Sequence, residues 1–152
     1  MSSITIERCI TVEQSGWLLL RQALWPRSDT EHLKEMCRIV AQSERCASLV
    51  AYSSGRQPIG LAEISVRYEH VNGASGSPVA FLEGLYVVPE FRRRQIASRL
   101  VEAAIEWAIL KGMTEIVSDT TVDNEVSQAL HRALGFTEVG RLVYFRKSLI
   151  KD

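Results

Sequence analysis

The order of predicted elements in residues 79–119 constrains the fold more than any other feature of this sequence. The pattern of apolar residues and turn formers predicts a strand, a short loop, a helix and a second strand, at residues 79–88, 89–95, 96–111 and 114–119. Gly112 follows the helix at the position where a left-handed cap belongs. Two strands joined through a helix form a βαβ unit, so this segment predicts parallel strands within an α/β fold.

Further elements are predicted on both sides of this unit. A first strand is expected over residues 3–10, and the spacing of Thr11 and Gln14 predicts a helix that runs from there to Leu24. An antiparallel hairpin, a later helix and a final strand are predicted at residues 46–53 with 58–69, at 124–134 and at 141–149.

A second capping-box spacing, Ser28 with Glu31, predicts another helix before the hairpin. Its apolar residues recur at helical intervals, which predicts a buried face. That face is expected to carry Leu33, Met36, Cys37 and Val40.

Length and composition indicate one domain spanning residues 1–152, with 46% hydrophobic and 24% charged residues. Eighteen basic and eighteen acidic residues give a formal net charge of +0, so neither nucleic acid nor an anionic membrane is an expected partner. The three cysteines and three histidines lack metal-ligand spacing, and no metal site is expected. A cytoplasmic location is expected, because no secretory signal and no apolar stretch of about 20 residues is visible.

The loop that opens the βαβ helix combines features that suit an anion. Ligands of such units bind at the carboxyl ends of the parallel strands, which here means residues 88–96. Unpaired amide groups and the positive end of the helix meet there, and Arg92-Arg93-Arg94 adds three guanidinium groups. A solvated arginine run without a ligand is the alternative interpretation, and the residues alone leave both open.

The run Arg92-Arg93-Arg94-Gln95-Ile96-Ala97 resembles the central motif of the GNAT acetyltransferases, which is Arg or Gln, two residues, Gly, one residue, then Gly or Ala. Gln95 departs from the motif, because it stands at the usual Gly position. If the loop requires a positive φ there, the side chain carries an energetic penalty. Asn124 and the run His131-Arg132-Ala133-Leu134-Gly135-Phe136 resemble the family's second motif, although Tyr is common where His131 stands. The resemblance implies a mixed, mostly antiparallel sheet with splayed parallel strands, flanked by helices.

The resemblance also implies acetyl-CoA as the cofactor. In such proteins the strand before the loop holds the pantetheine arm, the loop amides hold the pyrophosphate, and the Asn region borders the thiol. The cofactor-binding residues implied for this sequence are Leu85, Tyr86, Val87, Val88, Arg92, Arg93, Arg94, Gln95, Ile96, Ala97, Ser98 and Asn124.

Other segments are similar to bacterial aminoglycoside 6′-N-acetyltransferases, a much more specific match than the cofactor motif. They are Ala23-Leu24-Trp25-Pro26, Tyr68-Glu69-His70-Val71-Asn72-Gly73, Phe81-Leu82-Glu83-Gly84 and Ser118-Asp119-Thr120 with Asn124 and Ser127-Gln128. This similarity implies acetylation of the 6′-amino group of an aminoglycoside, antibiotic resistance and a homodimer. The substrate-binding residues that it implies are Trp25, Tyr68, Glu69, Glu83 and Asp119.

The acidic residues themselves fit a cationic substrate. Glu83 interrupts an apolar strand, where alternation places it on the face of Phe81, Leu85 and Val87. A carboxylate there is costly unless it has a partner. Asp119 follows at the end of the next strand, so both acids are expected to border one cleft. Without the resemblance, a solvated side chain or a cap is the commoner role for either acid.

Direct transfer is the expected mechanism. The substrate amine must lose a proton before it attacks, so Glu83 and Asp119 are the candidate bases, and Tyr144 is the candidate acid for the departing thiolate. The thioester oxygen is expected to accept from an amide such as that of Val88. The alternatives are an acetyltransferase for a protein N-terminus, a polyamine or another amine, and a non-catalytic sensor of acyl-CoA.

Overall fold

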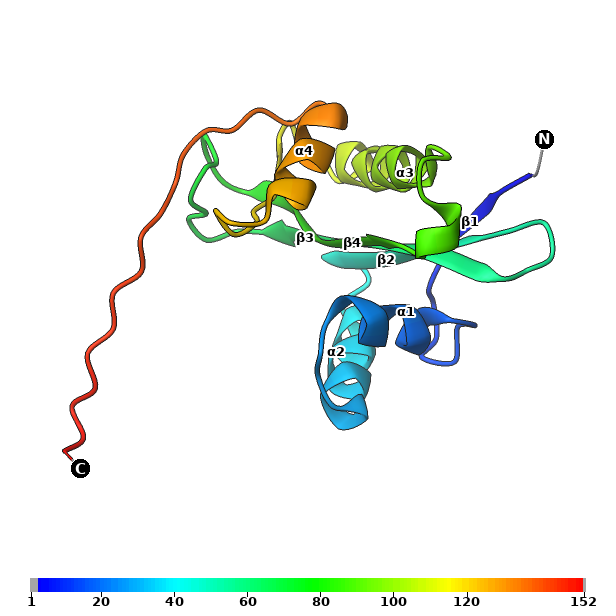
Figure 1. Ribbon diagram of the computed structural model, residues 1–152, viewed down its shortest axis with the longest axis horizontal. Helices are drawn as coiled ribbons and strands as arrows, with labels where there is room; N and C mark the ends of the chain where they lie inside the picture. The colour runs from blue at the N-terminus through cyan, green and yellow to red at the C-terminus, as the bar shows by residue number, and fades with distance from the viewer. Residues whose placement is uncertain (1–2, 152) are drawn as a thin grey trace. The chain divides into compact units, whose positions relative to one another are not determined.

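The computed structural model describes residues 3–151 as two units, residues 3–118 and residues 119–151. The first unit consists of a five-stranded sheet with helices on both of its faces (Figure 1). The second unit consists of one helix and an extended stretch of chain. Each unit is described by itself below.

The sheet of the first unit is mixed, as predicted. Its strands are β1 (Thr5–Arg8), β2 (Cys46–Tyr52), β3 (Pro58–Arg67), β4 (Val79–Val87) and β5 (Ile116–Val117). They lie in the order β1-β2-β3-β4-β5, and each neighbouring pair from β1 to β4 is antiparallel. The pair β4 and β5 is parallel, as the βαβ pattern requires.

Helices cover the two faces of this sheet. α1 (Trp17–Leu24) and α2 (Asp29–Ala41) lie on one face, and α3 (Ile96–Leu110) lies on the other (Figure 1). The core on the α1/α2 face is built around Trp17, Leu20, Met36, Val50 and Leu61. No helix in residues 3–151 is long and apolar enough to cross a membrane.

The predicted start of α2 and the predicted end of α3 are confirmed, but the predicted start of α1 is wrong. Ser28 precedes α2, and its hydroxyl accepts the backbone N–H of Glu31 at 3.2 Å. Gly112 follows α3 with a φ of +83°, the left-handed cap that was predicted. The prediction that α1 begins near Thr11 is wrong. Residues 11–16 form turns, and Gly16 stands before the helix with a φ of 80°, outside the helical region.

The buried face of α2 also differs from the prediction. Met36 is buried as expected, but Leu33 is 40% exposed and Cys37 is exposed. The polar His32 is buried instead, because its ring accepts from Arg21 Nε at 3.2 Å and lies 3.1 Å from the carbonyl oxygen of Trp25. These hydrogen bonds offset the cost of burying an imidazole, which a count of apolar residues does not register.

A β-bulge interrupts β4 at Glu83. Ile64 of β3 pairs with Leu82, and Glu63 pairs with Gly84, so Glu83 is an extra residue without a partner across the ladder. A bulge breaks the strict alternation of side chains along a strand. Glu83 and Gly84 consequently both face α1 and α2, where they contact Arg67 and Trp25.

The bulge corrects one prediction about the strand. Glu83 shares a face with Phe81, as expected, since both lie against the side chain of Arg67. Leu85 and Val87 lie after the bulge and point to the opposite face. Val87 pairs with Gly60, whose missing Cβ would approach α3, and Leu85 is two residues away on the same side.

In the second unit, Asn124 caps the start of α4 (Glu125–Ala133), because its side-chain oxygen accepts the backbone N–H of Ser127 at 3.0 Å. After α4, the chain from residue 137 to residue 151 holds no helix or strand (Figure 1). The predicted strand over 141–149 is therefore wrong for this structure. A strand needs a neighbouring strand for its backbone hydrogen bonds, and the described residues of this unit, 119–151, form no strand.

Candidate active site

The loop between β4 and α3 adopts a backbone that is costly for its sequence. The short 3-10 helix η1 (Pro89–Phe91) opens the loop, and both Arg93 and Gln95 have a φ of 63°. Left-handed backbone costs a residue with a side chain about 1–2 kcal/mol. Gln95 therefore keeps the conformation that suits the glycine of the motif and carries the side-chain penalty.

The loop presents a run of free amide groups. Within residues 3–151, the N–H groups of residues 93–98 donate no hydrogen bond to another protein atom, and no side chain caps α3. These donors surround the positive end of a helix of 15 residues. The geometry suits a phosphate group, which is the ligand that free amides at a helix start favour.

The arginine side chains of the loop are partly turned back on the protein. Arg92 Nε donates to the carbonyl oxygen of Val87 at 2.8 Å, and the guanidinium of Arg94 lies 5.1 Å from the centre of the Phe91 ring. We therefore expect the backbone amides of the loop to contribute more to any binding of an anion than these guanidinium groups do.

One edge of β4 is open where it approaches this loop. In the described chain, β5 pairs with β4 only at Ala80 and Phe81, so the following residues of β4 lack a partner on that side. The N–H of Val88 points the other way and donates to Ile59 at 2.9 Å. The prediction that Val88 donates to a thioester oxygen therefore conflicts with the structure. By alternation, the N–H groups of Leu85 and Val87 face the open edge.

A cavity of about 510 Å³ lies on the α1/α2 face of the sheet. α2 and β3 supply most of its wall, β2 adds two residues and β4 adds Glu83, and Trp25 and Arg27 line it from the segment between α1 and α2. Its charged lining residues are Glu35, Glu63, Glu83, Arg27, Arg38, Arg45 and Arg67. The cavity therefore offers carboxylates to a cation, each within reach of an arginine.

Glu83 reaches this cavity from the bulge in β4 with its side chain 32% exposed. Arg67 holds both carboxylate oxygens, with Nη2 at 2.7 Å from Oε1 and Nε at 3.0 Å from Oε2. Ser65 donates a third hydrogen bond to Oε2. Glu83 is thus a partly exposed carboxylate whose partners come from the neighbouring strand.

Trp25 packs directly on the backbone of the bulge. A Cβ at Gly84 would lie only 2.6 Å from two atoms of the Trp25 ring, so the ring occupies the space that a side chain would fill. The guanidinium groups of Arg21 and Arg27 lie 4.8 Å and 5.3 Å from the ring centre. These contacts hold a flat aromatic wall next to Glu83.

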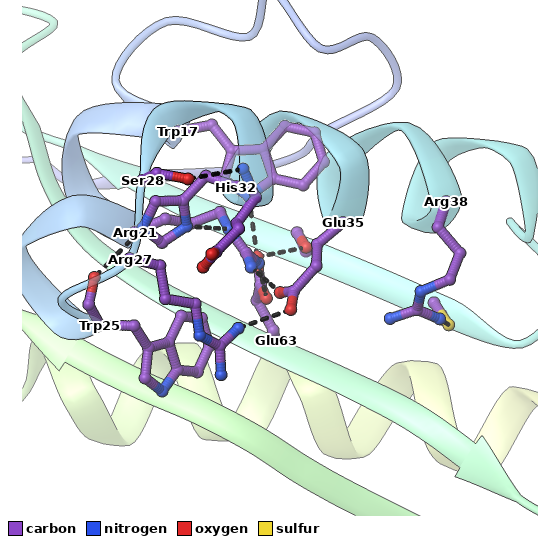
Figure 2. A network of polar contacts seen from close by, with 12 residues as sticks. Trp17, Arg21, Trp25, Arg27, Ser28, His32, Glu35, Arg38 and Glu63 are labelled. Carbon is purple, nitrogen blue, oxygen red and sulfur yellow. Dashed lines mark hydrogen bonds and ion pairs between the residues drawn. The ribbon is translucent and has the colours of Figure 1, made fainter.

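A second carboxylate, Glu63, lies deeper on the same face and is 4% exposed (Figure 2). Trp17 Nε1 donates to it at 2.8 Å, and Ser48 donates at 2.9 Å. The fully buried Arg21 bridges Glu63 to Glu35 of α2 through two ion pairs. Figure 2 shows this network reaching from the sheet through α1 to α2.

The buried network was missed in the sequence, although a signal is present. Arg21 stands four residues after Trp17, and His32 stands four residues before Met36, so each lies on the apolar face of its helix. A polar residue at such a position is buried only with partners. The two helices therefore signal a polar network without revealing that Glu63 is its centre.

A family model and a relative of known activity both identify this chain as an acetyltransferase. The model of the Acetyltransferase (GNAT) family matches residues 17–136. The chain belongs to the GNAT acetyltransferase family. It is 50% identical over 135 residues to an aminoglycoside N(6′)-acetyltransferase type 1 of Acinetobacter genomosp. 13, covering 89% of this chain and 92% of the relative.

Solved structures give the same result. The crystal structure of the aminoglycoside 6′-N-acetyltransferase AAC(6′)-Ih from Acinetobacter baumannii is 44% identical and superposes with a TM-score of 0.90, covering 97% of this chain and 99% of that one. The enzyme AAC(6′)-Iy, in complex with the bisubstrate analog CoA-S-monomethyl-acetylneamine, is 38% identical with a TM-score of 0.89 and a coverage of 96% and 99%. The predicted family and fold are thereby confirmed.

The substrate residues predicted for this acetyltransferase occupy different places in the first unit. Trp25 and Glu83 line the cavity. Tyr68 and Glu69 follow the end of β3 and are exposed outside the cavity lining, with the guanidinium of Arg45 4.9 Å from the centre of the Tyr68 ring. The structure therefore joins two of these predicted residues in one wall.

Three predicted residues belong to the second unit. Asp119 is its first residue and is exposed. Asn124 is exposed and caps α4. Tyr144 is 85% exposed in the extended stretch rather than in a strand. Their roles at the site remain predictions.

Proposed function

We propose that this chain is an aminoglycoside 6′-N-acetyltransferase, which acetylates the 6′-amino group of its substrate and thereby confers antibiotic resistance. The observation that carries the proposal is the Glu83 carboxylate, which lines a cavity from the same strand that leads into the amide-rich loop. An aminoglycoside is a polycation, and carboxylates bind ammonium groups through charge-assisted hydrogen bonds. The named relatives, among them the bisubstrate complex, support this substrate class.

Acetyl-CoA is the acetyl donor. The free amides of residues 93–98 would hold its pyrophosphate, with Arg92, Arg93 and Arg94 adding charge around them. Residues 85–88, at the end of β4 and just after it, would run along the pantetheine arm, and Asn124 would border the thiol. The N–H groups of Leu85 and Val87 are the donors available to the thioester oxygen on the open edge, in place of Val88.

Transfer is direct in this proposal. The amine nitrogen loses a proton to a carboxylate and attacks the acetyl carbonyl carbon, a C–N bond forms, and the C–S bond breaks as the thiolate leaves. Glu83 and Asp119 are the candidate bases, and Tyr144 is the candidate donor of a proton to the thiolate. Burial raises the pKa of the Cys9 thiol well above its usual range, which does not favour this residue as a covalent nucleophile.

The substrate wall combines aromatic and acidic residues. Trp25 offers a ring held beside Glu83, on which a sugar can pack. Tyr68, Glu69 and Asp119 are proposed to complete the wall when the substrate is bound. Their exposure leaves their side chains accessible to a ligand.

Three further properties are part of the proposal. The two units form one acetyltransferase domain, supported by a family match that runs from residue 17 to residue 136 across both. The enzyme works in the cytoplasm, and it forms a homodimer by its resemblance to the aminoglycoside enzymes. Light scattering of the purified protein measures the last of these directly.

The decisive experiment is a thiol-release assay with acetyl-CoA and a panel of amines. Kanamycin, tobramycin and gentamicin are compared with spermidine and a peptide, and mass spectrometry locates the acetyl group on the product. We expect release with aminoglycosides that carry a 6′-amino group. Release only with spermidine or the peptide would contradict the substrate, and tight cofactor binding without release by any amine would favour the acyl-CoA sensor.

A further inference from the structure

The carboxylate expected to meet the substrate is already occupied. Both oxygens of Glu83 accept from the guanidinium of Arg67, and Ser65 donates to one of them. An ammonium group of a substrate uses the same oxygens through the same charge-assisted hydrogen bonds. In the free protein, Arg67 thus stands where a substrate cation would bind.

Arg67 is held in this place but not enclosed. It is the last residue of β3, its guanidinium lies 3.6 Å from the centre of the Phe81 ring, and its side chain is 40% exposed. An ion pair with this much exposure contributes little to stability, and its long side chain can turn towards water without leaving a buried charge. The Arg21–Glu63 pair on the same face contrasts with it, because both of those side chains are almost fully buried.

The charges that line the cavity favour replacement of Arg67 by a cationic group of the substrate. Four arginines and three glutamates are among its lining residues, so the lining carries no excess of negative charge for a polycation. Arg21, behind the wall, adds a further positive charge that is bound to Glu63 and Glu35. Displacing one arginine from the cavity both frees a carboxylate and removes a repulsive charge.

We propose that Arg67 is a specificity-determining residue that occupies Glu83 as an internal counter-cation and is displaced by an ammonium group of the substrate. This inference rests on the proposed aminoglycoside function. A neutral or weakly charged amine lacks the charge to compete for Glu83, so the pair selects for polycations. The affinity for the substrate is lower than it would be without Arg67, since each binding event must first break this pair.

The test compares Arg67→Gln with Arg45→Gln by steady-state kinetics with tobramycin and acetyl-CoA. Both variants remove one positive charge from the cavity lining, but Arg45 stacks on Tyr68 and forms no ion pair with a described carboxylate. We expect Arg67→Gln to lower the KM for tobramycin about two- to five-fold, the size of an exposed ion pair, with the KM for acetyl-CoA unchanged. Arg45→Gln should lower it less.

A Glu83→Gln background gives the second arm of the test. If displacement of Arg67 from Glu83 is the cause, Arg67→Gln does not lower the KM for tobramycin in that background. A double-mutant cycle then shows the coupling between the two residues. A higher KM or a lower kcat in Arg67→Gln would overturn the inference, because Arg67 would then orient Glu83 for the substrate. An equal fall in Arg45→Gln would reduce the effect to general charge and also overturn it.

The outcomes separate this inference from the function on which it rests. If the wild-type protein releases no thiol with any aminoglycoside, the proposed function is wrong and the exchange is wrong with it. If the wild type acetylates tobramycin and Arg67→Gln leaves its KM unchanged, the exchange alone is wrong. Thermal melting of each variant shows that the kinetic differences come from folded protein.

Discussion

Glu63 and Glu83 face the same side of the sheet, and each is paired with an arginine, but their surroundings differ. Glu63 is 4% exposed and accepts from Trp17 and Arg21 of α1 and from Ser48 of β2. Glu83 has a side chain that is 32% exposed, and its partners lie on the neighbouring strand. One carboxylate is enclosed by the fold, and the other is open to exchange.

The difference follows from the strand on which each glutamate lies. Glu63 is in the middle of β3, where α1 covers it and where it has a partner in each neighbouring strand, Ser48 of β2 and Gly84 of β4. Glu83 is the extra residue of a bulge, which turns its side chain out of the regular pattern. A buried ion pair is costly to break, whereas a partly exposed one is cheap. We therefore expect Glu63 to contribute to stability, and we propose Glu83 for substrate binding.

The largest expected effect comes from breaking the enclosed pair with Arg21→Met. This change leaves Glu63 buried without its counter-charge, which costs about 3–5 kcal/mol of unfolding free energy. Urea denaturation measures the loss. Arg27→Met is the matched control, since Arg27 contacts the same Glu35 and the same Trp25 with a side chain that is 39% exposed. A loss of similar size in both variants would mean that the two pairs are equivalent.

Glu83→Gln should leave stability nearly unchanged and reduce catalysis. Losing a charge-assisted hydrogen bond to the substrate costs about 1.5–3 kcal/mol, or roughly 10- to 150-fold in kcat/KM for an aminoglycoside. The KM for acetyl-CoA serves as the internal control. Normal catalytic efficiency in a folded Glu83→Gln protein would place Glu83 with Glu63, as a structural residue.

Asp119→Asn distinguishes the two candidate bases and is expected to have a comparable effect, about 10- to 150-fold in kcat/KM. A raised KM with unchanged kcat would assign Asp119 to substrate positioning. A lower kcat that also removes the acidic limb of the pH profile would make Asp119, rather than Glu83, the base. Kinetics close to those of the wild type on every aminoglycoside would exclude Asp119 from the site.

Gly84→Ala tests how closely the open glutamate depends on Trp25. The new Cβ would lie 2.6 Å from the Trp25 ring and 2.9 Å from Leu24 Cδ2, so the ring must shift. We expect a loss of about 1–3 kcal/mol in unfolding free energy and a higher KM for the aminoglycoside. Gly76→Ala is the control, because no atom lies within 4 Å of its added Cβ. An unchanged KM would show that the Trp25 wall does not touch the substrate.

The sequence predicted the βαβ unit and the sheet because periodicity reports which residues are apolar and where turns occur. It placed Glu83 on the face of Phe81, yet it failed for Leu85 and Val87, since a bulge depends on the pairing with β3 and leaves no mark in the alternation. The face of α2 was missed for a similar reason. His32 is buried through partners on other elements, and spacing within one helix does not reveal them.

The candidate site divides in the same way. A short contiguous motif is enough to predict a cofactor role for the loop, which stays a prediction, whereas the Arg67–Glu83 pair requires two residues on adjacent strands to be brought together. The free donors on the β4 edge could not be predicted either. The register between β3 and β4 decides which N–H groups face that edge. The hydrogen bond from the Val88 N–H to the Ile59 carbonyl shows that Val88 donates towards β3 instead.

The smallest expected effect comes from Gln95→Gly, which changes the loop and leaves both glutamates in place. Gln95 has a φ of 63°, so glycine should relieve strain and raise the unfolding free energy by about 0.5–1 kcal/mol. Urea denaturation measures the gain.

Proline at the same position is the opposite test, because its φ is fixed near −65° and it lacks the N–H, so Gln95→Pro should raise the KM for acetyl-CoA. If the cofactor loop and the glutamates act independently, neither variant changes the KM for tobramycin at saturating acetyl-CoA. A change in that KM would mean that the loop and the β4 bulge are coupled through the strand that joins them.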